Sequence, residues 1–111
     1  MLYVNDDNTI ELTRGDTAYI SVPITEESTG DAYTMTSSDT LRFTIKKKET
    51  DEEPVVQKTA VGANNFHILP SDTAGLAFGK YIYDVELETA SGDVYTVIVP
   101  TEFKLLKEVT W

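Results

Sequence analysis

The sequence contains no cysteine and only one histidine, His67. Without cysteine there is neither a disulfide framework nor a thiolate metal site. A transition-metal site would have to rest on carboxylates, because no second histidine or cysteine can join His67. His67 lies between Phe66 and Ile68 in an alternating stretch, which predicts an outward-facing residue on a strand. We therefore expect no metal site and no cofactor.

Basic residues are also scarce, with nine against 19 acidic ones, so the formal net charge is −10. A chain of this charge repels a polyanion such as DNA or RNA. Three lysines do cluster at residues 46–48, but the acidic residues within 49–53 follow directly and cancel their field. The sequence therefore predicts no binding of nucleic acid.

Long hydrophobic runs are missing as well. The longest apolar stretch covers only residues 97–100, far short of the ~20 residues that span a bilayer. No basic segment followed by an apolar one comes after Met1, so we expect no signal peptide. The sequence predicts no membrane contact.

Signatures of catalysis are absent from the sequence. It has no Gly-x-Ser-x-Gly elbow and no glycine-rich phosphate loop. Asp84, Glu86 and Glu88 alternate along one predicted strand, and repulsion between such neighbours raises a carboxyl pKa. We interpret these carboxylates as a solvated outer face. The expectation is that the chain has no catalytic residues and is not an enzyme.

Alternation with period two is the strongest pattern that is present. It places Tyr81, Tyr83, Val85 and Leu87 on one face of residues 81–88. The stretches 17–24 and 41–46 alternate in the same way, and the second of them predicts a core position for Phe43. Shorter candidate strands cover residues 9–13, 32–35, 55–60, 65–68, 94–99 and 101–106. Residues 70–76 predict a single helical turn, with Ser71 as its cap and Gly75 at its end.

About eight or nine short strands with turns between them predict an all-β fold, and residues 1–111 form one domain. We expect an antiparallel β-sandwich that is immunoglobulin-like or jelly-roll-like. Parallel pairing is not expected, because the sequence offers no crossover helix.

The segment between the last two long strands predicts their register. Residues 89–93 fit a three-residue hairpin loop with Gly92 in the left-handed conformation and Thr89 paired with Asp93. This register sets three apolar pairs opposite each other: Leu87 with Tyr95, Val85 with Val97, and Tyr83 with Val99. Since all six residues are apolar or aromatic, we expect their face to be core.

The same register leaves Ile82, Ile98 and Pro100 on the outer face, with Ile82 opposite Pro100 and Ile98 opposite Asp84. Together they form a small apolar patch in an acidic surface. A chain with a net charge of −10 associates best where the surface is apolar and free of charge. We therefore expect this patch to contact a second subunit in a homo-oligomer or a different partner protein.

The tripeptide Arg14-Gly15-Asp16 matches an integrin-binding motif. It fits equally a tight turn between residues 9–13 and 17–24, because glycine provides the bend and Asp16 can accept hydrogen bonds from the backbone that follows. We interpret it as a turn.

The order of several turn-and-strand segments carries a family resemblance. Residues 12–18 lead into an alternating strand, residues 68–76 and 79–87 follow later, and residues 103–110 end the pattern. This layout resembles small β-sandwich structural or accessory proteins of phages and prophages of Gram-positive bacteria. It is also similar to the N-terminal domain of phage baseplate upper proteins, but unlike them we expect no long fibre or receptor-binding region after the last strand. The resemblance covers residues 12 to 110.

The resemblance implies a non-catalytic role at a tail, baseplate or head fibre. It implies other virion or prophage structural proteins as partners, and a location in the virion after assembly in the cytoplasm of the bacterial host. It carries no catalytic residue over to this chain. The alternative is a bacterial cell-surface or carbohydrate-binding β-sandwich module, which needs an exposed aromatic platform. Its only candidates are Tyr19, Tyr33 and Trp111, which are scattered along the sequence.

Overall fold

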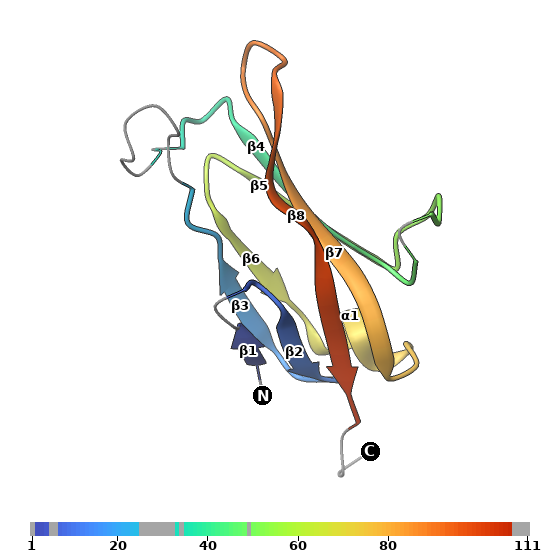
Figure 1. Ribbon diagram of the computed structural model, residues 1–111. Helices are drawn as coiled ribbons and strands as arrows, with labels where there is room; N and C mark the ends of the chain where they lie inside the picture. The colour runs from blue at the N-terminus through green and yellow to red at the C-terminus, as the bar shows by residue number, and fades with distance from the viewer. Residues whose placement is uncertain (1, 5–6, 25–32, 34, 49, 108–111) are drawn as a thin grey trace.

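A computed structural model describes residues 2–4, 7–24, 33, 35–48 and 50–107. Within these residues the chain is mostly β, with a single short helix. The elements in chain order are β1 (Leu2–Val4), β2 (Ile10–Thr13), β3 (Ala18–Ser21), β4 (Thr40–Lys46), β5 (Val56–Val61), β6 (Asn65–Ile68), α1 (Pro70–Ala74), β7 (Gly79–Glu88) and β8 (Val94–Leu106). A long β7–β8 hairpin runs the length of the molecule (Figure 1).

Two sheets make up the fold. The larger one curls and has six strands in the order β1-β2-β8-β7-β4-β5, and the smaller one pairs β3 with β6. Figure 1 shows β3 and β6 beside the lower part of the hairpin, while the hairpin tip lies above them. The small sheet therefore covers only part of the large one.

The prediction of purely antiparallel pairing is wrong for one pair of strands. β2 runs parallel to β8, with Ile10 opposite Phe103 and Leu12 opposite Leu105. A parallel pair needs a long connection rather than a helix as such. Here the connection is the whole chain from β3 to β7, which also builds the remaining strands. The prediction failed because it considered only a crossover helix as the connection between parallel strands. A connection made of several strands was not considered.

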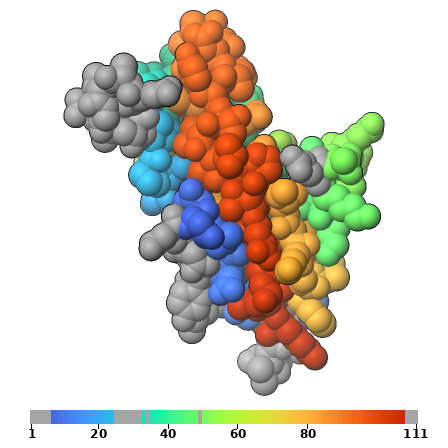
Figure 2. All heavy atoms as spheres, in the orientation of Figure 1, coloured from blue at the N-terminus to red at the C-terminus, as the bar shows by residue number. Residues whose placement is uncertain are grey.

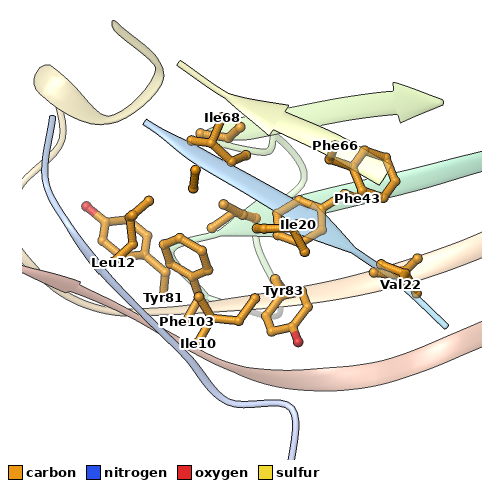
Figure 3. Packing of buried hydrophobic residues seen from close by; sticks show 14 of the residues in the cluster. Ile10, Leu12, Ile20, Val22, Phe43, Phe66, Ile68, Tyr81, Tyr83 and Phe103 are labelled. Atoms are coloured by element: carbon orange, nitrogen blue, oxygen red, sulfur yellow. The ribbon is translucent and has the colours of Figure 1, made fainter. Parts of the chain in front are cut away.

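The core lies between the two sheets, as the alternation predicts for β4 and β7. Phe43 and Val85 are fully buried, and their neighbours on the same faces are buried too. The Phe43 ring centroid lies 5.4 Å from that of Phe66 in the small sheet and 5.1 Å from that of Tyr83. Phe103 meets Tyr83 edge to face at 6.2 Å. These rings join both sheets into one core (Figure 3).

Helix α1 forms where the sequence predicts it, but its cap differs. The N-cap is Leu69 rather than Ser71. The carboxylate of Asp72 accepts a hydrogen bond from the Leu69 backbone N–H at 2.7 Å and forms a 2.7 Å ion pair with Lys58 of β5. Asp72 therefore satisfies a free N–H of the first turn and ties the helix to the large sheet. Gly75 ends the helix as predicted.

Two of the predicted strands are in fact one. Residues 94–99 and 101–106 are continuous in β8, because a sheet edge tolerates Pro100. For the predicted strand 32–35, the described residues Tyr33 and Met35 are not in a strand, and residues 32 and 34 lie outside the described ranges. Within the described part of the chain, no helix is long and apolar enough to span a membrane.

Candidate functional site

The turn of the β7–β8 hairpin has the predicted geometry. The Thr89 backbone N–H donates to the Asp93 carbonyl at 2.9 Å, and the Gly92 N–H donates to the Thr89 carbonyl at 3.0 Å. Gly92 has φ 90°, the left-handed region that glycine enters without a steric cost. Leu87 lies opposite Tyr95, so the register next to the turn is confirmed.

Farther from the turn the predicted register is wrong. Val85 lies opposite Ile98 rather than Val97, and Tyr83 lies opposite Thr101 rather than Val99. Two register shifts cause this, because β8 carries two more residues than β7 over the same length. The second shift includes Pro100. Because proline has no backbone N–H, it cannot donate an inter-strand hydrogen bond in a regular ladder. Bulges of this kind change which side chains face the core.

The bulges also change burial along β8. Val97 and Ile98 are both half-buried and pack against the core, whereas the predicted register puts only Val97 inside. Tyr95 and Val99 were expected in the core but are 55% and 66% exposed. Their expected partners on β7, Leu87 and Tyr83, are buried. The prediction therefore holds for β7 and fails for the upper half of β8.

The upper half of β8 is a sheet edge. β2 accompanies β8 only from Phe103 onward, and above that point none of the described strands pairs with this side of β8. We call residues 94–101 the β8 edge. No charged residue occurs between Asp93 and Glu102, although a quarter of the whole chain is charged. Val94 is 54% exposed beside the exposed Tyr95. An uncharged strand edge with exposed apolar residues is a template for pairing with another strand.

The backbone of the β8 edge is most open near the turn. Hydrogen-bonded and non-hydrogen-bonded pairs alternate along an antiparallel ladder. Because Thr89 and Asp93 form a hydrogen-bonded pair, Val94 and Thr96 turn their backbone N–H and C=O groups away from β7. At the other end, Thr101 Oγ1 donates to the Val99 carbonyl at 2.5 Å, and the neighbouring proline has no N–H. The pairing capacity is therefore concentrated between Val94 and Ile98.

The three residues predicted to form an interface do not share one patch. Ile82 lies opposite Glu102 rather than Pro100, and Ile98 lies opposite Val85 rather than Asp84. Ile98 packs against the core. Ile82 and the exposed Pro100 do line the same concavity on the outer face of the large sheet. The bulges separate Ile98 from the other two. Sequence reasoning also missed the β8 edge, although the uncharged run in 94–101 was a visible signal for it.

The concavity has a volume of about 270 Å³ and a mixed lining. Arg42, Lys46, Asp84 and Glu86 contribute charges of both signs beside Ile82. Burial raises the pKa of Asp84, and the nearby Glu86 carboxylate raises this pKa further, while Lys46 acts in the opposite direction. Among the described residues, no cluster of three or more His, Cys, Asp or Glu side chains is placed to hold a metal ion.

The Arg14-Gly15-Asp16 segment is a packed turn. The Arg14 guanidinium donates to the Leu76 carbonyl at 2.9 Å and lies 5.7 Å from the centre of the Phe78 ring. The Gly15 N–H donates to Thr73 Oγ1 at 2.8 Å. These contacts fasten the β2–β3 turn to α1 and the loop after it. The structure therefore agrees with the turn interpretation.

The candidate aromatic platform is reduced to one residue. Tyr19 is 72% exposed and stacks on the outward-facing His67 across the small sheet, with ring centroids 4.4 Å apart and planes 9° apart. The hydroxyl of Tyr33 instead donates to the buried Asp39 carboxylate at 2.7 Å. Trp111 lies outside the described residues. The structure brings Tyr19 and Tyr33 into no common surface.

Comparison with protein-family models finds no match, and comparison with curated proteins finds none.

Proposed function

We propose that this protein is a non-catalytic structural or accessory component of a phage or prophage particle, acting at a tail, baseplate or head fibre through protein–protein contacts. In this proposal its two sheets form a β-sandwich of immunoglobulin-like or jelly-roll-like type. It is assembled into the virion in the cytoplasm of the bacterial host, beside other virion proteins.

The β8 edge is the observation that supports this proposal. It combines outward backbone groups at Val94 and Thr96 with the exposed side chains of Tyr95 and Val99. Edge strands are normally protected by charge, by proline or by a covering element. In the part of the chain that the structure describes, Pro100 and the bulges protect one end only, and the other end has the groups that a protein partner would bind. A docking surface suits a component whose task is assembly.

Purified particles provide the test. Mass spectrometry of particles released by induction of the strain that carries the gene should detect this chain at a constant ratio to the main capsid or tail proteins. Capsid, portal or tail genes next to its own gene would agree with that result. A chain that is abundant in the soluble lysate and absent from purified particles would contradict the proposal.

A second candidate function is a carbohydrate-binding module, and the exposure of Tyr19 favours it. Sugars stack on open aromatic faces, and the outer face of the small sheet carries Tyr19, Ser21, Asn65 and His67 without any formal charge. A neutral glycan suits such a face better than an acidic one, since the whole chain has a net charge of −10.

A glycan array separates the two functions. Under the carbohydrate-binding hypothesis, the wild type binds a defined neutral glycan and Tyr19→Ala abolishes the signal. Tyr95→Ala is the matched control, because it removes an exposed tyrosine from a different surface. An array with no reproducible signal would dismiss this second function.

A further inference from the structure

We propose that the β8 edge is a self-association surface, on which the β8 strands of two copies of this chain pair antiparallel about a two-fold axis. This inference rests on the proposed function, in which the β8 edge makes protein contacts, and it identifies the partner as a second copy. The paired segment is short and centred near Thr96. It joins the two large sheets into one continuous sheet.

Backbone geometry favours a closed pair. Val94 and Thr96 direct their N–H and C=O groups away from β7, and an identical antiparallel edge presents the same groups in return. Pro100 and the Thr101–Val99 hydrogen bond end the ladder at the lower side. A two-fold contact uses the same edge on both copies, so association stops at the dimer and does not continue into a fibre.

The opposite edge of the large sheet, formed by β5, differs from the β8 edge. β5 contacts β6, and its Lys58 is held by the 2.7 Å ion pair with Asp72 of α1. A charged, engaged side chain is one of the devices that keep an edge strand from pairing. This contrast favours the β8 edge as the surface that pairs.

Electrostatics permits the approach of a second copy at this edge. Each copy carries a net charge of −10, so two copies repel wherever acidic rows meet. The nearest carboxylates on the neighbouring strand are Glu86 and Glu88 of β7, and Glu88 is paired with Arg42 at 3.1 Å. In the paired arrangement two β8 strands separate the β7 strands. Three strand spacings give about 14 Å, which exceeds the Debye length of about 8 Å at physiological salt.

Apolar burial adds to the backbone contacts. Val94 and Tyr95 are each more than half exposed next to the open backbone groups. On opposite faces of β8, they would pack against the β8 strand of the second copy, one on each side of the joined sheet. Asp93 lies beyond the turn end of the edge, and the antiparallel arrangement puts the two copies of Asp93 at opposite ends. No like charges are therefore brought face to face in the paired segment.

Sedimentation equilibrium of the full chain tests the pairing. From about 1 µM to about 1 mM, a range that covers weak to moderate dimers, the wild type should shift from the mass of one 12.3 kDa chain toward twice that mass. Thr96→Pro removes the outward N–H from each copy without removing a hydrogen bond to β7. It should raise the dissociation constant by at least about tenfold, because two edge hydrogen bonds are lost per dimer. Thr96→Ala keeps the N–H and should dimerise like the wild type.

Circular dichroism melting of each variant establishes that the monomer is folded. If Thr96→Pro fails to fold, Val94→Lys takes its place, because it puts a charged side chain from each copy into the apolar contact and leaves the backbone unchanged. It should abolish the dimer and restore the one-chain mass.

Two results overturn the pairing. One is a wild type that stays at the mass of one chain over the whole range. The other is a dimer that persists unchanged in folded Thr96→Pro and Val94→Lys. A monomeric wild type that is nevertheless found in particles, with incorporation lost in Thr96→Pro, also rejects the second copy as partner. That last result leaves the virion role standing, so the two proposals fail separately.

Discussion

The two halves of the β7–β8 hairpin share one turn and one alternating pattern, yet they have different surroundings. In the lower half, Tyr83 and Phe103 are buried beneath the small sheet, and β2 accompanies β8. In the upper half, Leu87 is buried while Tyr95, directly opposite, is 55% exposed. An apolar residue on an inward face is thus buried only where another element covers it. The β8 edge exists because, among the described residues, β2 and the small sheet accompany one half of the hairpin and no strand pairs with the outer side of the other.

Aromatic truncations in β8 should give the largest difference between the halves. Phe103→Ala removes a ring that is 1% exposed and should cost about 3–5 kcal/mol in the free energy of unfolding. Phe43→Ala should have an effect of the same size, since its ring is at the centre of the core. Tyr95→Ala in the upper half should cost less than about 1 kcal/mol. Urea unfolding at low protein concentration measures all three. Equal costs for Phe103→Ala and Tyr95→Ala would remove the distinction between the halves.

A pair of adjacent substitutions sharpens the comparison at the bulges. Ile98 packs against the core opposite Val85, so Ile98→Asp should destabilise the monomer by about 1–3 kcal/mol through desolvation of a charge. Val99 is 66% exposed, so Val99→Asp should change stability by no more than about 0.5 kcal/mol. Thermal melting distinguishes them. If Val99→Asp destabilised the protein more than Ile98→Asp, the result would support the register without bulges that the sequence predicts.

The smallest expected effect concerns pH at the upper end, where Asp39 precedes β4. Hydrogen bonds from the Thr36 backbone and from the Tyr33 hydroxyl hold the pKa of Asp39 below its usual value. A depressed folded-state pKa gives stability that is present above the unfolded value of about 3.9 and is lost as pH falls through the folded value. Asp39→Asn should therefore be less stable than the wild type at neutral pH. Below about pH 4, its free energy of unfolding should fall less steeply with decreasing pH.

Melting temperatures of both proteins between neutral and acid pH measure this contribution. Asp93→Asn is the matched control, because it removes an exposed carboxylate of the hairpin turn. Curves for Asp39→Asn and wild type that stay parallel throughout would mean that Asp39 does not contribute to the acid sensitivity.

Much of the local structure was predictable from particular residues. The alternation of Leu41, Phe43 and Ile45 correctly predicted the buried face of β4, since the pleat sends every second side chain to the same side. Gly92 correctly predicted the turn type and, through it, the register at Leu87 and Tyr95. These features depend on neighbours within a few residues, so a linear pattern contains the information they need.

The candidate site was not predictable in the same way. Pro100 signalled an irregular strand, but neither its presence nor the alternation tells how many residues a bulge inserts. The predicted patch of Ile82, Ile98 and Pro100 therefore did not form as one surface, and its role in contacts stays a prediction. The uncharged run of residues 94–101 was visible, but it fits a buried strand as well as an open edge.

By itself the sequence determined the β class, the faces of β4 and β7, the hairpin turn and an acidic surface, because pleat, turn chemistry and charge are local properties. Only the tertiary structure decided that β2 lies parallel to β8, that the small sheet lies beside the lower half of the hairpin, and that no described strand pairs with the outer side of β8 from Val94 to Thr101. Strand order depends on contacts between distant segments, and many strand orders bury the same alternating faces. The open edge is a consequence of that choice.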